Sequence, residues 1–369
     1  MRRTPLLLLA ACLLSSAAQA QSTYQQKDFA TVRKFDSHIH ANIADPVFLD
    51  VARKDGFELL SINVDYPDFP PLPMQAAAVH TLQAEAPDRF HFATTFSMKG
   101  FGTPGWTERA NAALDAAVKQ GAVAVKVWKN IGMVATDDKG KRVFLDDPRF
   151  DGVMQHIEAL HLPLIAHQGE PKNCWLPLDQ MTTDNDRSYF RDHPEYYMYL
   201  HPEEPSYEAL MAARDRFVAR HPHLTFVGAH MASLEWSVDA LAKFLDRFPN
   251  ANVDLAARMT QVQYQSNRDY EKVRNFFLKY QDRLIYGTDL TLSPPDPKAR
   301  AQNPPVQSDF AKEADDFWRS DWIYLATPDS QHIDAIGADA RGLGLPRSVI
   351  DKIYYTNAHR VFLHETVKP

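Results

Sequence analysis

The chain has 369 residues, of which 45% are hydrophobic and 24% are charged, a balance typical of a folded globular protein. Its formal net charge of −7 gives no electrostatic basis for binding nucleic acid or an anionic membrane surface. The length fits one large domain or two medium ones, because α/β barrels commonly exceed the usual domain size.

Residues 1–20 have the composition of a secretory signal peptide. Arg2 and Arg3 supply positive charge, Leu6 to Leu14 form an apolar centre, and Ala18-Gln19-Ala20 is a small-residue cleavage site. The apolar run is too short for a stable membrane span. We therefore expect cleavage after Ala20 and export to the periplasm or the medium. The alternative is a lipoprotein anchored through Cys12, although only a short apolar run precedes that cysteine.

Removal of this segment would take away two arginines and no acid, so the net charge would fall from −7 to −9. Cys174 would then be the only cysteine, which excludes an intrachain disulfide even in an oxidising compartment. Stability must in that case come from a buried core.

Short apolar runs alternate with amphipathic segments along the rest of the chain. The hydrophobic spacing predicts eight strands and several helices between them. Eight strands alternating with helices indicate parallel pairing and closure into a (β/α)8 barrel, an α/β fold. Because the alternation is continuous, we expect a single domain over residues 21–369. The predicted strands are Val32–His40, Leu59–Asp65, Phe90–Phe96, Ala122–Trp128, Leu162–His167, Leu224–His230, Asn252–Ala256 and Leu284–Asp289, and the clearest predicted helices are Thr107–Gln120, Pro148–Leu160, Tyr207–Arg220, Leu234–Phe248 and Tyr270–Tyr280.

Two of the connecting loops are unusually long. Gly169–Pro205 follows the fifth strand and is rich in aromatic residues, whereas Ser293–Asp309 follows the eighth and is rich in proline. Loops of this length are usually functional or disordered, and in a βα barrel the loops after the strands form the active-site face. We expect the aromatic loop to be an ordered lid. The alternative is a surface excursion that packs only on itself.

The stretch from Phe35 to His40 places two histidines on one predicted strand. Alternate side chains of a strand share a face, so His38 and His40 point the same way about 6.6 Å apart. Two imidazoles at that separation can bind one metal ion and leave further positions for other strands. Taken alone, the pattern equally fits a half-buried strand with two incidental histidines.

Polar residues also end three later strands, namely His167, His230 and Asp289. Each alone could be a strand-end cap or a satisfied core histidine. Four histidines and an aspartate at the same end of one barrel, however, favour a metal centre at the rim where such enzymes place their catalytic groups. Nitrogen and carboxylate ligands suit Zn²⁺, with Mn²⁺, Fe²⁺ or Co²⁺ as alternatives.

Lys126 lies inside the apolar run Ala122–Trp128. An ammonium buried against apolar side chains would be costly, so we expect Lys126 to face the barrel mouth, where it meets a metal, a carboxylate or an anionic substrate. Burial can also lower its pKa enough for a carbamate to form with carbon dioxide. A lysine that merely extends to the rim is the alternative without function.

With these residues the chain resembles the amidohydrolase superfamily. More narrowly it is similar to the amidohydrolase-2 or amidohydrolase-related branch, which holds hydrolases and the aminocarboxymuconate-semialdehyde decarboxylase-like lyases. The resemblance covers essentially the whole mature chain. It is carried by His38-Ile39-His40, Lys126, His167, His230, Asp289 and the segment Tyr355–Phe362.

The resemblance implies that His38, His40, His167 and Asp289 bind one divalent cation, while His230 contacts the activated water or the substrate. In members with two ions, a carboxylated lysine at the position of Lys126 bridges them, and the histidine at the position of His230 is a ligand. One ion is favoured here, and two remain compatible with the residues.

We therefore expect a metal-dependent hydrolase that uses metal-activated water to cleave an amide, ester or lactone bond of a small carbonyl compound. Asp289 would transfer the proton and His230 would stabilise developing charge. A metal-dependent decarboxylase and a non-catalytic metal- or ligand-binding protein are the alternatives, and a homo-oligomer is compatible with the sequence. The residues predicted to contact the small-molecule substrate are Glu170, Lys172, Asn173 and Arg258.

Overall fold

The computed structural model describes residues 22–294 and 310–368. Its main sheet is parallel, and the strand order is β8-β7-β6-β5-β4-β3-β2-β1-β9. Consecutive strands therefore lie side by side, as predicted for a βα barrel. The strands are β1 (Lys34–Ala41), β2 (Phe57–Ile62), β3 (Phe90–Thr95), β4 (Ala122–Val127), β5 (Leu164–Ala166), β6 (Phe226–Gly228), β7 (Ala251–Asp254), β8 (Leu284–Ile285) and β9 (Leu290–Leu292).

The barrel closes through the stretch that carries β8 and β9. β8 pairs with β7, and β9 pairs with β1. Between them, the Ser37 amide donates to the Tyr286 carbonyl at 3.0 Å and the Asp289 amide donates to the His38 carbonyl at 2.7 Å. Of the strand predicted over Leu284–Asp289, only Leu284–Ile285 forms a strand, and the next strand begins just beyond it at Leu290. The positive φ of 71° at Asp289 interrupts its extended backbone.

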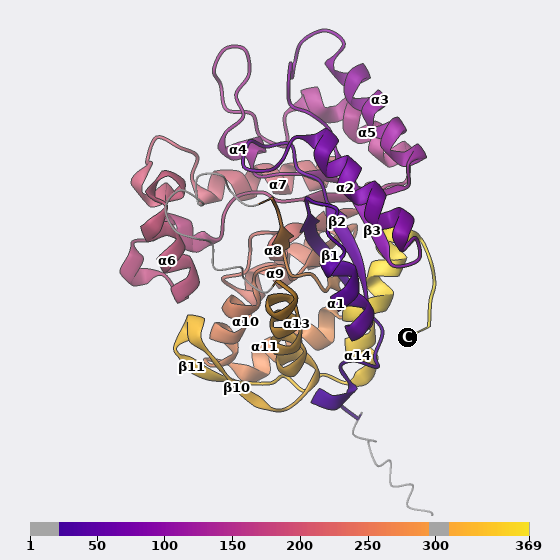
Figure 1. Ribbon diagram of the computed structural model, residues 1–369. Coiled ribbons are helices and arrows are strands. Elements are labelled where there is room, and N and C mark those ends of the chain that lie inside the picture. Colours follow the sequence, from indigo (N-terminus) through magenta and orange to yellow (C-terminus); the bar gives the residue numbers. More distant parts are fainter. Residues whose placement is uncertain (1–21, 295–309, 369) are drawn as a thin grey trace, which may run out of the picture.

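Helices surround the strands (Figure 1). Side-chain caps fix several of their starts: Ser206, Ser237 and Asp269 each accept a hydrogen bond from the backbone three residues later. The helices are α1 (Val47–Asp55), α2 (Leu72–Glu85), α3 (Trp106–Lys119), α4 (Asn130–Met133), α5 (Asp151–Ala159), α6 (Asp184–Asp192), α7 (Tyr207–Arg220), α8 (Ala229–Ala232), α9 (Val238–Arg247), α10 (Met259–Ser266), α11 (Tyr270–Tyr280), α13 (Phe310–Ala326) and α14 (Arg347–Asp351). An antiparallel hairpin of β10 (Ser330–Ile333) and β11 (Ala338–Arg341) follows α13.

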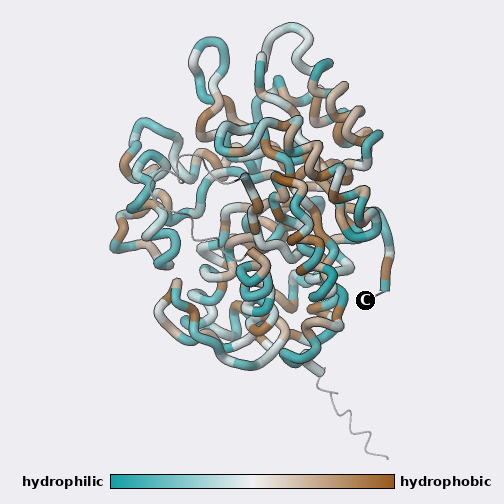
Figure 2. Tube along the Cα trace, in the orientation of Figure 1, coloured by the Kyte–Doolittle hydropathy of each residue, from teal (hydrophilic) through white to brown (hydrophobic). Residues whose placement is uncertain are grey.

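Apolar residues concentrate toward the middle of the molecule, as Figure 2 shows. One core fills the space between strands and helices, and a second fills the barrel interior. Phe35, Leu60 and Val227 of the strands contribute to this interior core together with Tyr355 and Phe362 from the end of the chain. The C-terminal segments η8 (Lys352–Thr356) and η9 (His359–Leu363) therefore close the amino-terminal end of the barrel.

The long loop over residues 169–205 is ordered. It contains α6 and the short helices η3 (Lys172–Trp175), η4 (Leu178–Gln180), η5 (Pro194–Tyr196) and η6 (Met198–Leu200). Cys174, Met181, Phe190 and Tyr197 give it a small core of its own. The loop packs on itself, as expected of a surface excursion. It also forms one wall of a pocket at the barrel mouth, as expected of an ordered lid.

Two predicted features lie outside the described residues: the signal peptide over residues 1–20 and nearly all of the loop predicted over Ser293–Asp309. Within residues 22–294 and 310–368, no helix combines the length and the apolar character needed to span a bilayer.

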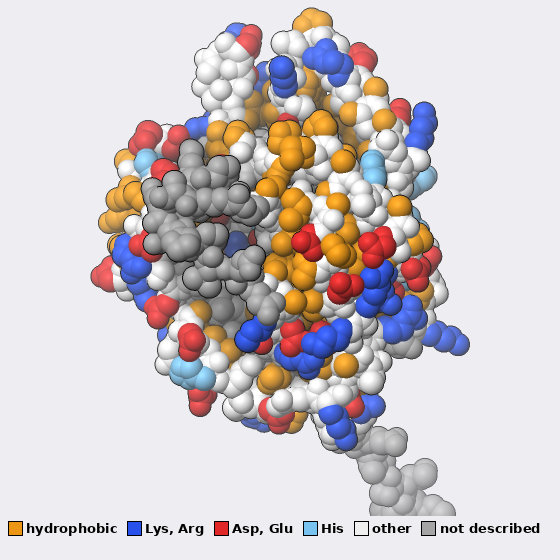
Figure 3. Space-filling model, viewed as in Figure 1, with side chains coloured by type: hydrophobic (Ala, Val, Ile, Leu, Met, Phe, Trp, Pro, Cys, Tyr) orange, Lys and Arg blue, Asp and Glu red, His pale blue; other side chains and the backbone are white. Residues whose placement is uncertain are grey.

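Figure 3 shows charged side chains gathered over α1 and α13, where Lys54 and Arg319 pair with Asp315, and apolar side chains gathered over α2 and its neighbouring loops.

Candidate metal centre

The four predicted histidines and Asp289 meet at the carboxyl end of the barrel. The Asp289 Oδ1 atom lies 3.2 Å from Nε2 of His40 and 3.5 Å from Nε2 of His38. The His230 ring centroid lies 4.8 Å from that of His38 and 4.2 Å from that of His167. Among the described residues, the side chains of His38, His230 and Asp289 bring their ligand atoms within 4.8 Å of one another, a spacing that one metal ion can bridge.

Three of the imidazoles are fixed in the same tautomer. Nδ1 of His40 donates to the Ile62 carbonyl at 2.7 Å, and Nδ1 of His230 donates to the Ala256 carbonyl at 2.9 Å. Nδ1 of His38 donates to the Asp254 carboxylate at 2.9 Å. Because each partner is an acceptor, the hydrogen is on Nδ1, and each Nε2 carries a lone pair that a cation can bind, although at His38 the Lys126 Nζ atom also lies within hydrogen-bond distance of it.

The protonation states agree with this geometry. Burial lowers the pKa of His38, and it holds the pKa of His167 and His230 well below their ordinary value, so these rings are neutral near pH 7. Nε2 of His167 is buried and makes no hydrogen bond. Burial opposes the ionisation of Asp289, but the pKa of this carboxyl is held well below its usual range when the facing His230, His40 and His38 are protonated, and with neutral rings a bound cation would supply that positive charge instead.

This donor set fits a divalent cation. Neutral imidazole nitrogens and an ionised carboxylate are the ligands of zinc and related metals. The orphaned Nε2 of His167 would also gain a partner, and an unpartnered buried nitrogen is otherwise costly. The side chains that would hold the ion are those of His38, His40, His167 and Asp289, with His230 close enough to take part.

Lys126 faces the same centre from β4. Its Nζ atom is buried and lies 3.3 Å from Nε2 of His38. Burial lowers the pKa of this ammonium to about 8, which keeps a fraction of the amine unprotonated at neutral pH. The expectation that Lys126 points to the barrel mouth is therefore met by its position, while its chemical role stays a prediction.

His230 lies in a strained turn directly after β6. Four consecutive residues, His230 to Ser233, have φ between 55° and 57°, the left-handed region that residues with a Cβ rarely occupy. Buried donors hold the turn: Arg214 donates to the Ala232 carbonyl and Tyr207 to the Ser233 carbonyl. Strain of this kind persists only where the surroundings enforce it, and it concentrates at functional sites.

Comparison with known families shows to which protein family this chain belongs. The family model Amidohydro_2, described as amidohydrolase, matches residues 35–363. The chain belongs to this amidohydrolase family. Its members are mostly metal-dependent enzymes, which accords with the histidine and carboxylate cluster at the mouth of this barrel.

Solved structures share the amidohydrolase fold at low sequence identity. 2,6-Dihydroxybenzoate decarboxylase from Rhizobium is 17% identical, with a TM-score of 0.53 over 90% of this chain and 99% of that one. An uncharacterized TIM-barrel protein from Bordetella bronchiseptica is 16% identical, with a TM-score of 0.52 over 90% and 99% of the two chains. No curated protein matches the sequence.

Sequence reasoning missed two carboxylates that hold this amidohydrolase site together. Asp254, the last residue of β7, accepts hydrogen bonds from Nδ1 of His38 at 2.9 Å and from the His230 amide at 2.7 Å. Asp36 joins β1 to the stretch before Asp289, because it accepts from the His38 amide and from both the amide and hydroxyl of Thr288. The available signal for both was an acidic residue within a predicted strand, where charged side chains are uncommon, although that signal does not identify its partners.

The predicted substrate contacts have different surroundings. Glu170 is buried, pairs with Lys129 and lines a pocket beside the metal centre. The Lys172 ammonium lies 4.1 Å from the centroid of the Trp236 ring, outside the walls of that pocket. The buried Asn173 amide donates to Asp186 at 2.8 Å within the loop.

Arg258 is the predicted contact that acts on the histidines most directly. The residue is buried, its Nη1 donates to the Ala257 carbonyl at 2.8 Å, and its Nε makes no hydrogen bond. Its positive charge adds to the burial that lowers the pKa of His167 and His230. The structure thus brings Glu170 and Arg258 near the centre and places Lys172 and Asn173 in the supporting loop.

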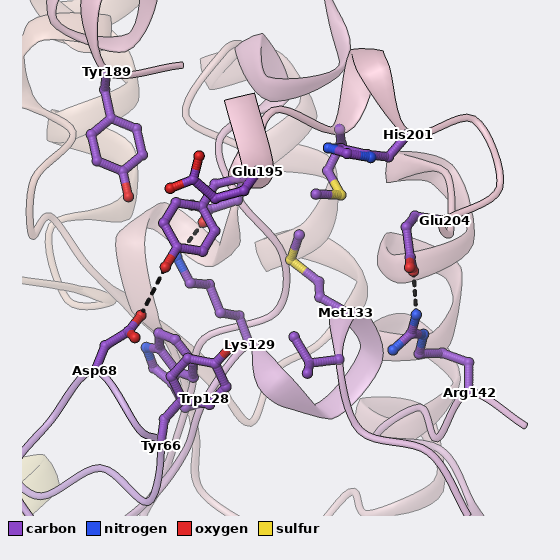
Figure 4. A pocket seen from close by; sticks show the side chains of 14 residues that line it. Tyr66, Asp68, Trp128, Lys129, Met133, Arg142, Tyr189, Glu195, His201 and Glu204 are labelled. Atoms are coloured by element: carbon purple, nitrogen blue, oxygen red, sulfur yellow. Dashed lines mark hydrogen bonds and ion pairs between the residues drawn. The ribbon is translucent and has the colours of Figure 1, made fainter. Parts of the chain in front are cut away.

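A pocket of about 440 Å³ adjoins the histidines at the same end of the barrel. Trp128, the residue after β4, forms part of its wall, and its ring centroid lies 6.4 Å from that of His167. Figure 4 shows Tyr66, Tyr189 and Lys129 around the same space. The volume is in the range of small-molecule sites, so the metal centre has a substrate-sized space beside it.

Proposed function

We propose that the protein is a metal-dependent hydrolase that cleaves an amide, ester or lactone bond of a small carbonyl compound. The observation that carries the proposal is the tautomer of His38, His40 and His230, whose Nδ1 atoms are all occupied by oxygen acceptors. Their Nε2 lone pairs are thereby left for a cation. Zn²⁺ is the expected ion, with Mn²⁺, Fe²⁺ or Co²⁺ as alternatives.

A divalent cation bound here would polarise the scissile carbonyl and lower the pKa of a water molecule towards neutrality. Asp289 is placed to accept the proton of that water, because its side chain is 32% exposed whereas those of His38 and His40 are 0% and 4% exposed. As the bond from the carbonyl carbon to the leaving group breaks, Asp289 passes this proton to the leaving atom.

His230 has a related role in the same proposal. Its Nδ1–H is committed to the Ala256 carbonyl, so Nε2 is an acceptor until it takes up a proton. If Nε2 rather than Asp289 takes the proton of the attacking water, the resulting imidazolium can stabilise negative charge on the carbonyl oxygen and then pass that proton to the leaving atom. The His230 amide donates to Asp254, and this hydrogen bond keeps the ring in position.

Lys126 decides between one ion and two. If its amine forms a carbamate that bridges two ions, Lys126→Ala should halve the metal content, and short carboxylic acids should restore part of the activity. If Lys126 only contacts the substrate, the metal content should stay constant and KM should rise. Elemental analysis beside steady-state kinetics separates these outcomes, and a variant unchanged in both would show that Lys126 has no role at the site.

The second candidate is a decarboxylase on the same scaffold, a reaction supported by the fold shared with 2,6-dihydroxybenzoate decarboxylase. A panel of esters, lactones, amides and carboxylic acids tests both functions with the metal-loaded protein. Acid formation from the first three classes supports hydrolysis, whereas release of carbon dioxide from the acids supports the lyase. Full metal occupancy without turnover of any compound would instead favour a non-catalytic binding protein.

The proposal includes export. The arginine pair, the leucine-rich centre and Ala18-Gln19-Ala20 support a cleaved leader and a mature chain that begins at Gln21. N-terminal sequencing of exported protein should read from that glutamine. A chain that instead begins at a lipidated Cys12 would replace this expectation with membrane anchoring.

A further inference from the structure

The pocket beside the histidines is built from three segments that follow barrel strands. Tyr66 and Asp68 follow β2, Trp128 and Lys129 follow β4, and Tyr189 to Glu204 belong to the long loop after β5. The Tyr196 hydroxyl donates to Asp68 at 3.3 Å and joins the loop to the segment after β2 (Figure 4). Segments from three parts of the chain therefore enclose the pocket, as is usual for a site that binds a small molecule.

Trp128 links this pocket to the reacting end. Its ring lies 6.4 Å from His167 and 5.8 Å from Phe69, whose own ring lies 5.1 Å from His40. None of the four histidines lines the pocket. A substrate with its scissile bond at the cluster would therefore extend its unreacting part past Trp128 into this space.

The positive charges in the pocket already have acidic partners. Lys129 pairs with Glu170 and lies 5.0 Å above the Trp128 ring, and Arg142 pairs with Glu204. Asp68, by contrast, has no basic partner within ion-pair distance among the described residues. An incoming anion would have to break an existing pair, whereas an incoming cation would find an available carboxylate.

The aromatic walls favour the same kind of ligand. The Tyr66 and Trp128 rings lie 4.3 Å apart, and the Tyr189 and Tyr196 rings are nearly parallel with centroids 6.4 Å apart. Tyrosine and tryptophan rings accept flat groups by stacking and hold cations over their faces. Met133 and Met198 add polarisable side chains that adapt to different ring shapes.

We propose that this pocket binds the unreacting part of the substrate and selects an aromatic group that carries a protonated amine. The inference depends on the proposed function only for the position of the reacting bond at the histidine cluster. It assigns specificity to Trp128, Tyr189 and Asp68, none of which holds the metal. The paired Lys129 and Arg142 make an anionic ring the unfavourable ligand.

Three probes of one shape and different charge test the proposal: benzylamine, benzyl alcohol and benzoate, titrated calorimetrically at neutral pH. The expected order of affinity is benzylamine, then benzyl alcohol, then benzoate. Titration of both the wild type and His38→Ala removes the metal centre as an alternative site for the benzoate carboxylate. Tightest binding of benzoate in His38→Ala would overturn the proposal.

Variants of the pocket residues test which side chains contact the probes. Asp68→Asn should lower the preference for benzylamine over benzyl alcohol about two- to fivefold, the range of an exposed ion pair. Tyr189→Ala should weaken both amine and alcohol by about threefold, and Trp128→Leu by on the order of tenfold. Tyr189 is 43% exposed, so its variant should fold even if Trp128→Leu does not. Asp192→Asn in the same loop is the matched control, because its carboxylate is 60% exposed and both it and its partner Arg191 lie outside the pocket.

The failure of this inference and that of the proposed function give different results. If benzylamine binds as expected but no ester or amide is cleaved, the hydrolase function fails and the pocket assignment stands. If esters are cleaved but those with anionic rings have the highest kcat/KM, the hydrolase function stands and the pocket assignment fails. Unchanged benzylamine affinity in both Asp68→Asn and Tyr189→Ala would also overturn the assignment.

Discussion

Histidines meet carboxylates at both ends of this barrel, but the two clusters have opposite chemistry. At the mouth, burial lowers the pKa of His38, His167 and His230. At the base, burial also opposes the protonation of His359, yet Glu58 and Glu365 outweigh it and raise the pKa of this imidazole. One end therefore holds neutral rings and the other a charged one.

The positions of the acceptors explain the difference. At the base, Nε2 of His359 lies 3.0 Å from Glu58 and Nδ1 lies 2.9 Å from Glu365, so carboxylates face both nitrogens. At the mouth, oxygen acceptors occupy the Nδ1 atoms, and the Nε2 atoms of His38 and His40 share the single carboxylate of Asp289. An imidazole between two carboxylates supports structure, whereas one with a free lone pair can bind a metal.

The largest expected effect separates the two ends by activity. Asp289→Asn should lower kcat by a factor on the order of 10² to 10⁴, because it removes the proton acceptor at the mouth. Glu58→Gln, the matched change at the base, should leave kcat within about threefold in protein that remains folded, because Glu58 lies at the far end of the barrel. Steady-state kinetics on metal-loaded protein measures both. A similar loss of kcat in the two variants would contradict the assignment of catalysis to the mouth and of a structural role to the base.

The next effect concerns metal affinity. Asp254→Asn removes the charge that orients His38 and should weaken metal binding about 10- to 100-fold, the usual effect of a partner behind a metal-ligating histidine. Competition with a chelator measures this affinity. The comparison variant is Glu365→Gln, which changes the carboxylate behind His359 and should leave metal affinity unaltered. Equal affinity in wild type and Asp254→Asn would contradict the role given to Asp254.

The third effect is on stability and its pH dependence. Burial raises the pKa of Glu58, but the facing imidazoles of His359, at 3.0 Å, and His91, at 3.8 Å, outweigh it and lower the value from 4.5 to about 2. The stabilisation from Glu58 is therefore present above pH 4.5 and is lost as the pH falls towards 2. The raised pKa of His359 adds stabilisation below pH 6.5 that is lost as the pH rises through its folded value.

The base should accordingly contribute most between pH 4.5 and 6.5. We expect Glu58→Gln to lower the free energy of unfolding by about 2 kcal/mol in that window, less than for a fully buried pair because solvent reaches the cluster. Urea titrations of wild type and variant at pH 3, 5.5 and 8.5 give the difference at each pH. A difference that is largest at pH 8.5 would show that the pair does not carry this stabilisation.

The smallest expected effect tests the strained turn under His230. Tyr207→Phe removes the hydroxyl that donates to the Ser233 carbonyl and should cost about 1 kcal/mol of stability. Because the turn positions His230, kcat should fall severalfold while the metal content stays constant. Tyr280→Phe is the control, since its hydroxyl serves a helix pair on the outside of the barrel. A loss of stability without any change in kcat would make the turn purely structural.

Much of the fold was accessible from the sequence because barrel strands buried on both faces give continuous apolar runs. Ala122–Val127 and the segments around His167 and His230 are examples, and each ends at the rim where its polar residue lies. The division of the eighth strand was not accessible, because it depends on the left-handed backbone of Asp289. An aspartate can adopt either an extended or a left-handed backbone, so its presence in the sequence does not reveal which one occurs.

The site was accessible as a set of residues but not as a hydrogen-bond network. His38 and His40 lie in the carboxyl half of β1, and His167, His230 and Asp289 follow β5, β6 and β8, a pattern that the local sequence reveals. The roles of Asp254 and Asp36 arise from partners 216 and 252 residues away, His38 and Thr288 respectively. Specific contacts at such separations depend on the closed barrel, so no local pattern of hydrophobicity could assign them.

The closure of the barrel base by Tyr355 and Phe362 has a consequence for how the chain folds. The interior core is complete only when a segment made last reaches strands that were made first, and β1 also needs β9 to satisfy its edge. Such distant contacts make folding slow and leave a partly made chain with exposed apolar surface. Cutting the chain before Tyr355 should thus prevent folding altogether, whereas removal of the two residues after Val367 should be tolerated.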